Sequence, residues 1–334
     1  MRQPIFVAGV SYGATRSALI ADIANRRGIR LRGLILASSC LAKQPDQVVR
    51  RPRRGEMPWH SSDLTYIQLL PTFTATAFFH KKLSPNLERN FDETLGQAEG
   101  WATRIYPKVL AQADGSNRKL LRAAAAEMGR LTGLSSDVIL KYKFRIEPSH
   151  FLEELLGADS TPIGVLDSRS TKADEATSGY SLNWYPVLSS LYLGRELHFK
   201  SRVPYASFLD PPSVNVFFHG WNCEARDDDS NCLATPRTWL RLQRAMRENP
   251  SLRVMITNGY YDTGCPYFGT KMAISQLSPN LKQRVSGIYF QAGHSPSPEL
   301  RAAVASFIQS TLAKSQAYPK TDVRGVALVS SNGW

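Results

Sequence analysis

Four short apolar runs stand out along the chain, and polar or glycine-rich residues follow each of them. The runs cover residues 4–9, 31–37, 252–257 and 285–290. Runs of this length between turn residues are typical of strands buried in a parallel sheet. Residues 14–27, between the first two runs, have apolar positions at helical spacing and end near Gly28. Residues 1–37 therefore predict one βαβ unit with a right-handed crossover.

Helical spacing dominates much of the remaining chain. Pro71 is well placed at a helix start, because the first helical residues need no N–H donor, and we expect this helix over 72–80. Other helices are predicted over 90–113, 117–131, two parts of 134–156, the later part of 180–196, 236–249, 266–277 and 297–313. Two more stretches, 163–167 and 214–221, are apolar and rich in β-forming residues, which predicts strands.

This order of elements predicts an α/β core that is interrupted by a mainly helical cap. The expected parts are 1–42 and 201–316 for the core, 43–200 for the cap and 317–334 for a frayed tail. No stretch of about eighteen apolar residues is present, so we expect no membrane span. We also expect no signal peptide, because the chain begins almost directly in a strand.

The net charge of +13 raises the question of a polyanionic partner. The basic residues are spread along the chain, and the tight cluster Arg50-Arg51-Pro52-Arg53-Arg54 lies in a polar stretch that is typical of a solvated loop. We therefore expect no nucleic-acid partner. Nothing in the sequence predicts the oligomeric state.

The chain has four cysteines, of which Cys223 and Cys232 bracket a polar stretch. A local disulfide in an oxidising compartment and two free thiols explain this spacing equally well. The cysteine spacing matches no zinc pattern. We expect neither a metal nor a cofactor.

The first apolar run ends in Gly9-Val10-Ser11-Tyr12-Gly13, and a helical pattern follows. A Gly-x-Ser-x-Gly sequence between a strand and a helix is the context of a nucleophile elbow, in which a strained turn exposes the serine hydroxyl. Small residues on both sides are expected to let the turn close tightly. The alternative is a strand-to-helix turn that contains a serine by chance.

Asp262 lies just after the run at 252–257, and His294 lies just after the run at 285–290. Serine, acid and histidine in this chain order are typical of the α/β-hydrolase fold, and the carboxyl ends of parallel strands meet at one edge of a sheet. His294 is the candidate base for Ser11, and Asp262 would orient its imidazole. The backbone N–H of Tyr12 is a candidate oxyanion donor.

Each of these residues also has an ordinary structural interpretation. Asp262 is a good turn former, and His294 fits a loop histidine. The combination of elbow, order and strand ends nevertheless favours an α/β-hydrolase fold, a mostly parallel sheet flanked by helices. The other histidines are interpreted as structural or surface residues: His60, His80, His150, His198 and His219.

The chain resembles the serine carboxypeptidases, particularly their bacterial members. The resemblance rests on four stretches: Gly9-Val10-Ser11-Tyr12-Gly13, Leu70-Pro71-Thr72-Phe73-Thr74-Ala75-Thr76-Ala77, Asn258-Gly259-Tyr260-Tyr261-Asp262, and Tyr289-Phe290-Gln291-Ala292-Gly293-His294. It implies a peptide substrate, release of carboxy-terminal amino acids through an acyl-enzyme without metal, a triad of Ser11, Asp262 and His294, and a secreted or periplasmic setting.

Two departures from the family pattern matter. Val10 replaces the glutamate that binds the substrate carboxylate in the family, and valine cannot donate a hydrogen bond. The elbow falls at Ser11, whereas the family has several strands and an oxyanion loop before it, so we expect that the upstream strands are missing. An esterase without carboxylate recognition and an inactive homologue that binds partners through its basic loop remain alternatives.

Overall fold

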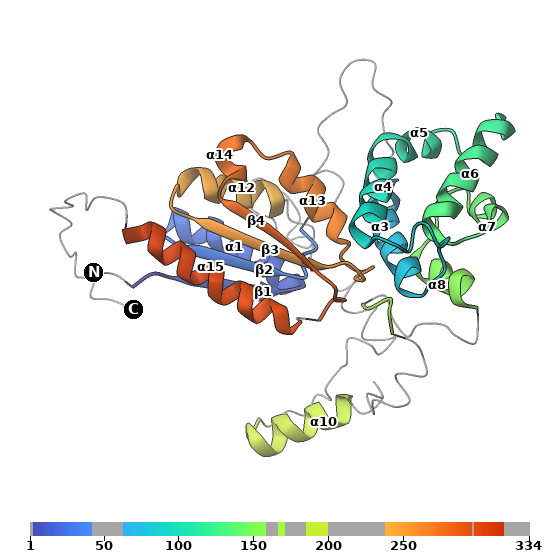
Figure 1. Ribbon diagram of the computed structural model, residues 1–334. Coiled ribbons are helices and arrows are strands. Elements are labelled where there is room, and N and C mark those ends of the chain that lie inside the picture. Colours follow the sequence, from blue (N-terminus) through green and yellow to red (C-terminus); the bar gives the residue numbers. More distant parts are fainter. Residues whose placement is uncertain are drawn as a thin grey trace, which may run out of the picture.

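The computed structural model describes residues 3–41, 63–157, 166–170, 185–199, 238–295 and 297–316. They form an α/β fold, in which helices flank a four-stranded, all-parallel sheet. Figure 1 shows a second group of helices, α3 to α8, beyond the end of the sheet where the strands finish. No helix within these ranges is long and apolar enough to cross a membrane.

The sheet has the order β1-β2-β3-β4, so sequence neighbours are also spatial neighbours. The strands are β1 Phe6–Val10, β2 Gly33–Ala37, β3 Arg253–Gly259 and β4 Val285–Phe290. Every residue of β2 is buried, which explains its continuous apolar run. β1 lies at one edge, and its outer side pairs with no other strand of the described ranges.

Alternate residues of the strands face two separate cores. Leu34, Leu36 and their neighbours on β3 pack against α1 Tyr12–Arg26, α12 Thr238–Glu248, α13 Tyr267–Ser275 and α14 Pro279–Lys282. Ile35 and Met255 pack on the other face against α15 Pro298–Gln316. This alternation follows from the two-residue repeat of a strand. The sheet is therefore packed between two layers of helices (Figure 1).

The second group of helices has its own continuous core. Its members are α3 Asp63–Phe79, α4 Phe91–Arg104, α5 Tyr106–Leu110, α6 Arg118–Thr132, α7 Ser136–Lys141 and α8 Pro148–Leu156. Phe73 and Phe151 stack in this core with ring centroids 3.9 Å apart. Tyr261 and Tyr267, which follow β3, belong to the same core and join the helices to the sheet. Two further elements are α10 Tyr185–Leu191 and the π-helix η3 Tyr192–Glu196.

The structure confirms the four sheet strands and most predicted helices, with differences at particular places. Pro71 lies inside α3, so its prediction as a helix start is wrong. The predicted helix over 90–113 divides into α4 and α5 at Ile105. Leu166 and Asp167, the described residues of the strand predicted over 163–167, lie outside any strand. The short helix α14 was not predicted.

Several sequence predictions fall outside the described residues. They concern the basic cluster at 50–54, the strand at 214–221, Cys223 and Cys232, and the tail. The proposed boundaries of core and cap stay predictions.

The burial of α3 explains why Pro71 is tolerated in its interior. A proline there removes one helical hydrogen bond and costs about 3 kcal/mol in an isolated helix. Nearly all of α3 is buried, including Leu70 and Phe73 on either side of the proline. Packing of this apolar helix against its neighbours therefore outweighs the local preference, which sequence periodicity does not reveal.

Candidate active site

Ser11 occupies a strained turn between β1 and α1. Its φ is 57° and its ψ is −125°, a conformation that costs a non-glycine residue of the order of 1–3 kcal/mol. Its backbone N–H donates to Ala37 O at 2.9 Å, which ties the turn to the end of β2. Val10, the last residue of β1, is 44% exposed, and Tyr12 begins α1. The sequence therefore forms the sharp strand-to-helix turn that its motif predicts.

The two glycines of the motif are not equivalent. A Cβ atom on Gly9 would collide with the backbone of Gly13 and with Ser17 Oγ, whereas a Cβ atom on Gly13 would meet no atom within 4 Å. The expectation that the turn needs both small residues is therefore right for Gly9 and wrong for Gly13.

Substitution of these glycines by alanine should separate the two roles. Gly9→Ala should lower the free energy of unfolding by about 1–3 kcal/mol, because the added methyl group meets backbone. Gly13→Ala, in the first turn of α1, should be neutral or slightly stabilising. Urea denaturation of both variants measures the difference, and equal losses would contradict this account of the turn.

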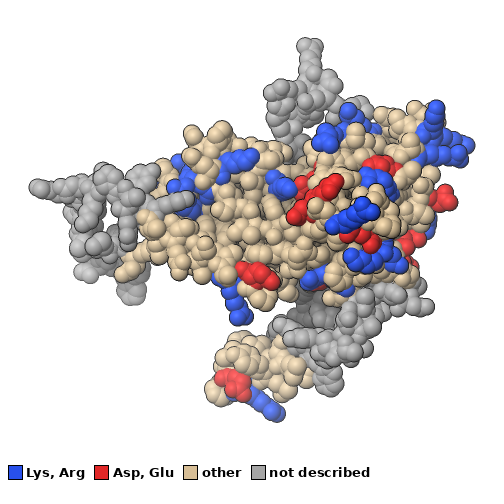
Figure 2. Space-filling model, in the orientation of Figure 1, with Lys and Arg blue, Asp and Glu red and all other residues tan. Residues whose placement is uncertain are grey.

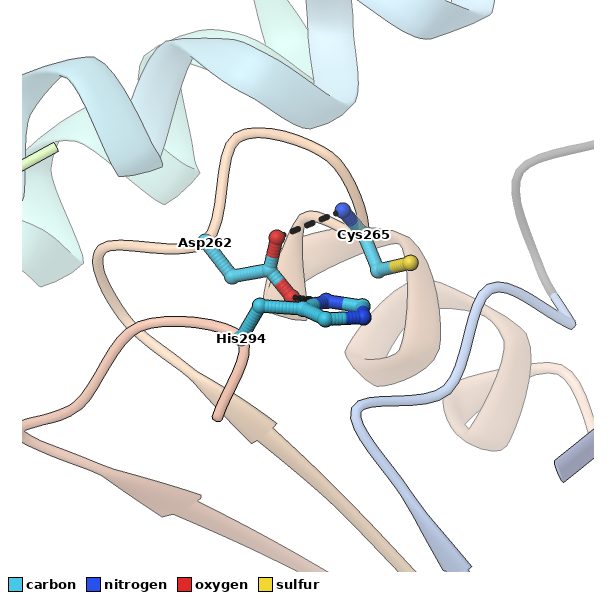
Figure 3. Close-up of side chains that lie close together, drawn as sticks. All are labelled: Asp262, Cys265 and His294. Carbon is cyan, nitrogen blue, oxygen red and sulfur yellow. Dashed lines mark hydrogen bonds and ion pairs between the residues drawn. The ribbon is translucent and has the colours of Figure 1, made fainter. Parts of the chain in front are cut away.

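Asp262 and His294 form a hydrogen-bonded pair beyond the carboxyl ends of β3 and β4. His294 Nδ1 lies 2.7 Å from Asp262 Oδ2, and Asp262 is fully buried. The other carboxylate oxygen, Oδ1, accepts the backbone N–H of Cys265 at 2.9 Å. Figure 3 shows these two contacts, which fix the carboxylate on both sides. With Nδ1 occupied by Asp262, Nε2 is the imidazole nitrogen that remains for a reacting group.

Buried polar contacts hold the Asp262 loop against the end of β2. The Asn258 side chain donates to Ser39 O at 2.9 Å and to Cys265 O at 3.0 Å, and it accepts from Thr270 Oγ1 at 2.9 Å. A disulfide joins Cys40 to Cys265, with Cα atoms 4.8 Å apart. The loops that follow β2 and β3 are therefore linked both covalently and by hydrogen bonds.

The loop that carries His294 turns back across the sheet from β4 towards β1. Ser38 Oγ, directly after β2, donates to His294 O at 2.5 Å. Ala37, the residue before Ser38, accepts the N–H of Ser11. The backbone of His294 and the backbone of Ser11 therefore both contact the end of β2. Adjacent strands are about 4.8 Å apart. Within the described ranges, the Ser11 hydroxyl makes no hydrogen bond to the imidazole. The structure therefore brings Asp262 and His294 into contact, and it leaves Ser11 on a separate turn at the same end of the sheet.

A short segment, residues 166–170, braces the histidine loop, and we call it the strap. Leu166 O accepts the N–H of His294 at 2.6 Å. Arg169 donates to Gln291 O at 2.8 Å and forms a two-pronged ion pair with Asp167. The alpha carbon of Gly293 packs so closely on Asp167 that a side chain there would collide with it.

The strap is itself anchored to the sheet and to α3. Ser168 donates through N–H and Oγ to Tyr261 O, both at 3.0 Å, and its Oγ lies 2.6 Å from Thr76 Oγ1. His80 Nε2 lies 2.8 Å from Ser168 O, in keeping with its interpretation as structural. Burial raises the pKa of Tyr261 to about 12, so its neutral hydroxyl donates to Gln291 Oε1 at 2.5 Å. The strap therefore connects the aspartate loop, the histidine loop and the neighbouring helices.

Asp262, Cys265 and His294 also offer atoms of the kinds that bind metal ions, all within 4.8 Å of one another. The Cys265 sulfur is bonded to Cys40, however, and the carboxylate and imidazole bind each other. A disulfide sulfur is not the thiolate that a metal requires. This arrangement fits an oriented histidine better than a metal centre.

Sequence reasoning missed several residues that shape this site. The Cys40–Cys265 disulfide, Ser38 and the strap had no assigned role, and the sequence held no local signal for them. Asn258 lies in a stretch that resembles the family, but no role was assigned to it. A comparison with protein-family models, with curated proteins and with solved structures found no match for this chain.

Proposed function

We propose that this chain is a serine hydrolase of the α/β-hydrolase type, which removes carboxy-terminal amino acids from peptides through an acyl-enzyme. The observation that carries the proposal is the buried Asp262–His294 pair, which lies at the same end of the parallel sheet as a serine in a strained turn. Orientation of an imidazole by a buried carboxylate is the arrangement that prepares histidine to act as a base. The four stretches that resemble serine carboxypeptidases support the narrower assignment.

The residues take roles that follow from their positions. His294 Nε2 would accept the proton of Ser11 while the serine oxygen attacks the scissile carbonyl, and it would return that proton to the leaving amine. Asp262 holds Nδ1 and stabilises the imidazolium that forms. The N–H of Tyr12 would donate to the developing oxyanion, a contact of a kind typically worth about 10²–10³-fold in turnover. Water then releases the acyl group by the same route.

Substrate selection depends on which residue binds the substrate carboxylate, because the glutamate that does so in serine carboxypeptidases is Val10 here. Val10 offers no hydrogen bond at the position of the family glutamate, and its side chain is 44% exposed. An unpartnered substrate carboxylate that becomes buried costs about 1–3 kcal/mol. This loss is the reason for a second candidate function, an esterase that does not recognise a substrate carboxylate. The Cys40–Cys265 disulfide supports an oxidising compartment.

The direct test is labelling with a fluorophosphonate probe, followed by peptide mapping. We expect the label on Ser11 in the wild-type protein and no label there in Ser11→Ala. Peptides with free and with amidated carboxyl termini, and an activated ester, then separate carboxypeptidase from esterase activity. A folded wild-type protein that takes no label on Ser11 would contradict the proposal and favour an inactive homologue.

The strap gives a second prediction about the same reaction. Arg169→Met removes the contact with Gln291 O and the ion pair with Asp167, so the histidine loop should shift. Displacements of about 1 Å in an active site cost up to about 10²-fold in rate. We expect kcat to fall by roughly 10- to 100-fold with little change in KM, and Arg169→Lys to restore part of the loss.

The experiment on Arg169 must distinguish an effect on the position of His294 from a general loss of protein stability. The proton resonance of His294 Nδ1–H reports the contact with Asp262, and it should shift or broaden in Arg169→Met and recover in Arg169→Lys. An unchanged resonance together with a lower melting temperature would assign Arg169 a purely structural role.

A further inference from the structure

An open hollow of about 800 Å³ lies at the opposite end of the sheet from Ser11, Asp262 and His294. Arg253 is the first residue of β3, and Arg284 directly precedes β4. Arg247 contributes from the last turn of α12. The hollow is therefore formed by the end of α12, by α14 and by the amino ends of β3 and β4, and it has no residue in common with the candidate active site. Figure 1 shows α12 and α14 on the side of the sheet away from α3 to α8.

The hollow is lined by three arginines and by no acidic residue. Arg284 donates to the backbone oxygens of Asn249 and Asn280, at 3.0 and 3.1 Å. Arg247 donates to Gln243 Oε1 at 3.1 Å. None of the three arginines forms an ion pair with a residue of the described ranges.

Several other arginines of the described ranges are paired with carboxylates. Examples are Arg130 with Glu127, Arg145 with Asp63 and Arg169 with Asp167. On the face drawn in Figure 2, basic residues lie over α12 and α14, and the acidic residue of α12 is Glu248 at its end. Burial, and secondly the charge of Arg253, lower the pKa of Arg284. No described carboxylate forms an ion pair with the three arginines of the hollow.

We propose that this hollow, called the arginine hollow below, binds a diphosphate group. Three guanidinium groups carry three positive charges, whereas a single phosphate carries only about −1.5 to −2 at neutral pH. Two linked phosphates match this charge better. Guanidinium groups bind phosphate oxygens in a two-pronged geometry. Ser278, Asn280 and Gln283 line the same hollow and offer neutral hydrogen-bonding groups.

The test is calorimetric titration of the full chain with inorganic pyrophosphate and with orthophosphate at constant ionic strength. We expect pyrophosphate to bind at least tenfold more tightly than orthophosphate. Arg253→Gln should weaken pyrophosphate binding by tenfold or more. Arg253 is the variant of choice because its side chain makes no hydrogen bond within the described residues, so its loss should leave the fold intact, which a melting curve checks.

A matched control and a second ligand complete the experiment. Arg122→Gln, on the exposed side of α6, removes the same charge far from the hollow and should leave binding unchanged. Binding of ADP that is tighter than that of pyrophosphate would identify the diphosphate of a nucleotide, and weaker binding would identify free diphosphate. Equal affinity for pyrophosphate and orthophosphate, or an equal loss in Arg122→Gln, would overturn the proposal in favour of general surface charge.

Discussion

Replacement of Ser11 by alanine should reduce the hydrolysis of every substrate by about 10⁴-fold or more, since removal of a nucleophile of this kind leaves only the residual effect of binding and oxyanion contacts. The fold should survive the change. Alanine keeps the Cβ atom of serine, so the cost of the positive φ at this position is nearly the same. Within the described residues, the Ser11 hydroxyl makes no hydrogen bond that would be lost. Steady-state kinetics with an activated ester and a peptide measure the effect.

Two further variants make the result specific. Ser116→Ala removes an exposed hydroxyl in the loop between α5 and α6 and should leave the rate unchanged. Asp262→Asn keeps the shape of the contact with His294 Nδ1 but favours the wrong tautomer, for a loss of roughly 10⁴-fold. Hydrolysis that persists at the wild-type rate in Ser11→Ala would remove Ser11 from the site. A loss in Ser11→Ala with full activity in Asp262→Asn would instead leave the serine in place and remove the aspartate.

The sheet and the candidate site were accessible from sequence because both depend on local patterns. Continuous apolar runs identify strands that are buried on both faces, as β2 and β3 are. Residues that directly follow such strands must gather at one edge of a parallel sheet. This geometry alone predicts that Ser11, Asp262 and His294 lie at the same edge, before any contact between them is known.

The contacts that complete the site depend on distant parts of the chain, which local patterns do not encode. Arg169 and Gln291 are 122 residues apart, and Cys40 and Cys265 are 225 residues apart. No periodicity links such positions. Pro71 is a similar case, because the burial that makes it tolerable inside α3 comes from surrounding helices. Sequence reasoning therefore locates the candidate side chains but not the residues that hold them.

Asp22 should be the carboxylate on which stability depends most. It is fully buried in α1 and accepts hydrogen bonds from Arg241 at 2.9 Å and from Arg244 at 2.7 and 2.8 Å. Both arginines belong to α12, so the pairs join the two helices that cover one face of the sheet. Asp22→Ala would remove the buried carboxylate to which Arg241 donates, and the Arg241 side chain is only 7% exposed. Removal of one partner of a buried pair costs about 3–5 kcal/mol.

Urea denaturation at neutral pH measures this loss, and Glu127→Ala is the matched control. Glu127 pairs with Arg130 on α6, where the two side chains are 39% and 37% exposed, and exposed pairs contribute at most about 1 kcal/mol. A loss in Asp22→Ala as small as that in Glu127→Ala would contradict the prediction and would mean that apolar packing, not the buried ion pairs, holds α1 against α12.

The pH dependence of Asp22→Ala tests the same interaction by its charge. Burial alone would raise the pKa of Asp22, but the hydrogen bonds and charges of Arg244 and Arg241 outweigh burial and hold the pKa below its ordinary value. A carboxyl group with a lowered pKa in the folded state contributes stability that is fully present above its unfolded pKa, about 3.9. That contribution is lost as the pH falls through the lower folded value. The stability difference between the wild-type protein and Asp22→Ala should therefore be constant near neutral pH and shrink below about pH 4. A difference that stays constant down to acid unfolding would mean that Asp22 acts by packing and not by its charge.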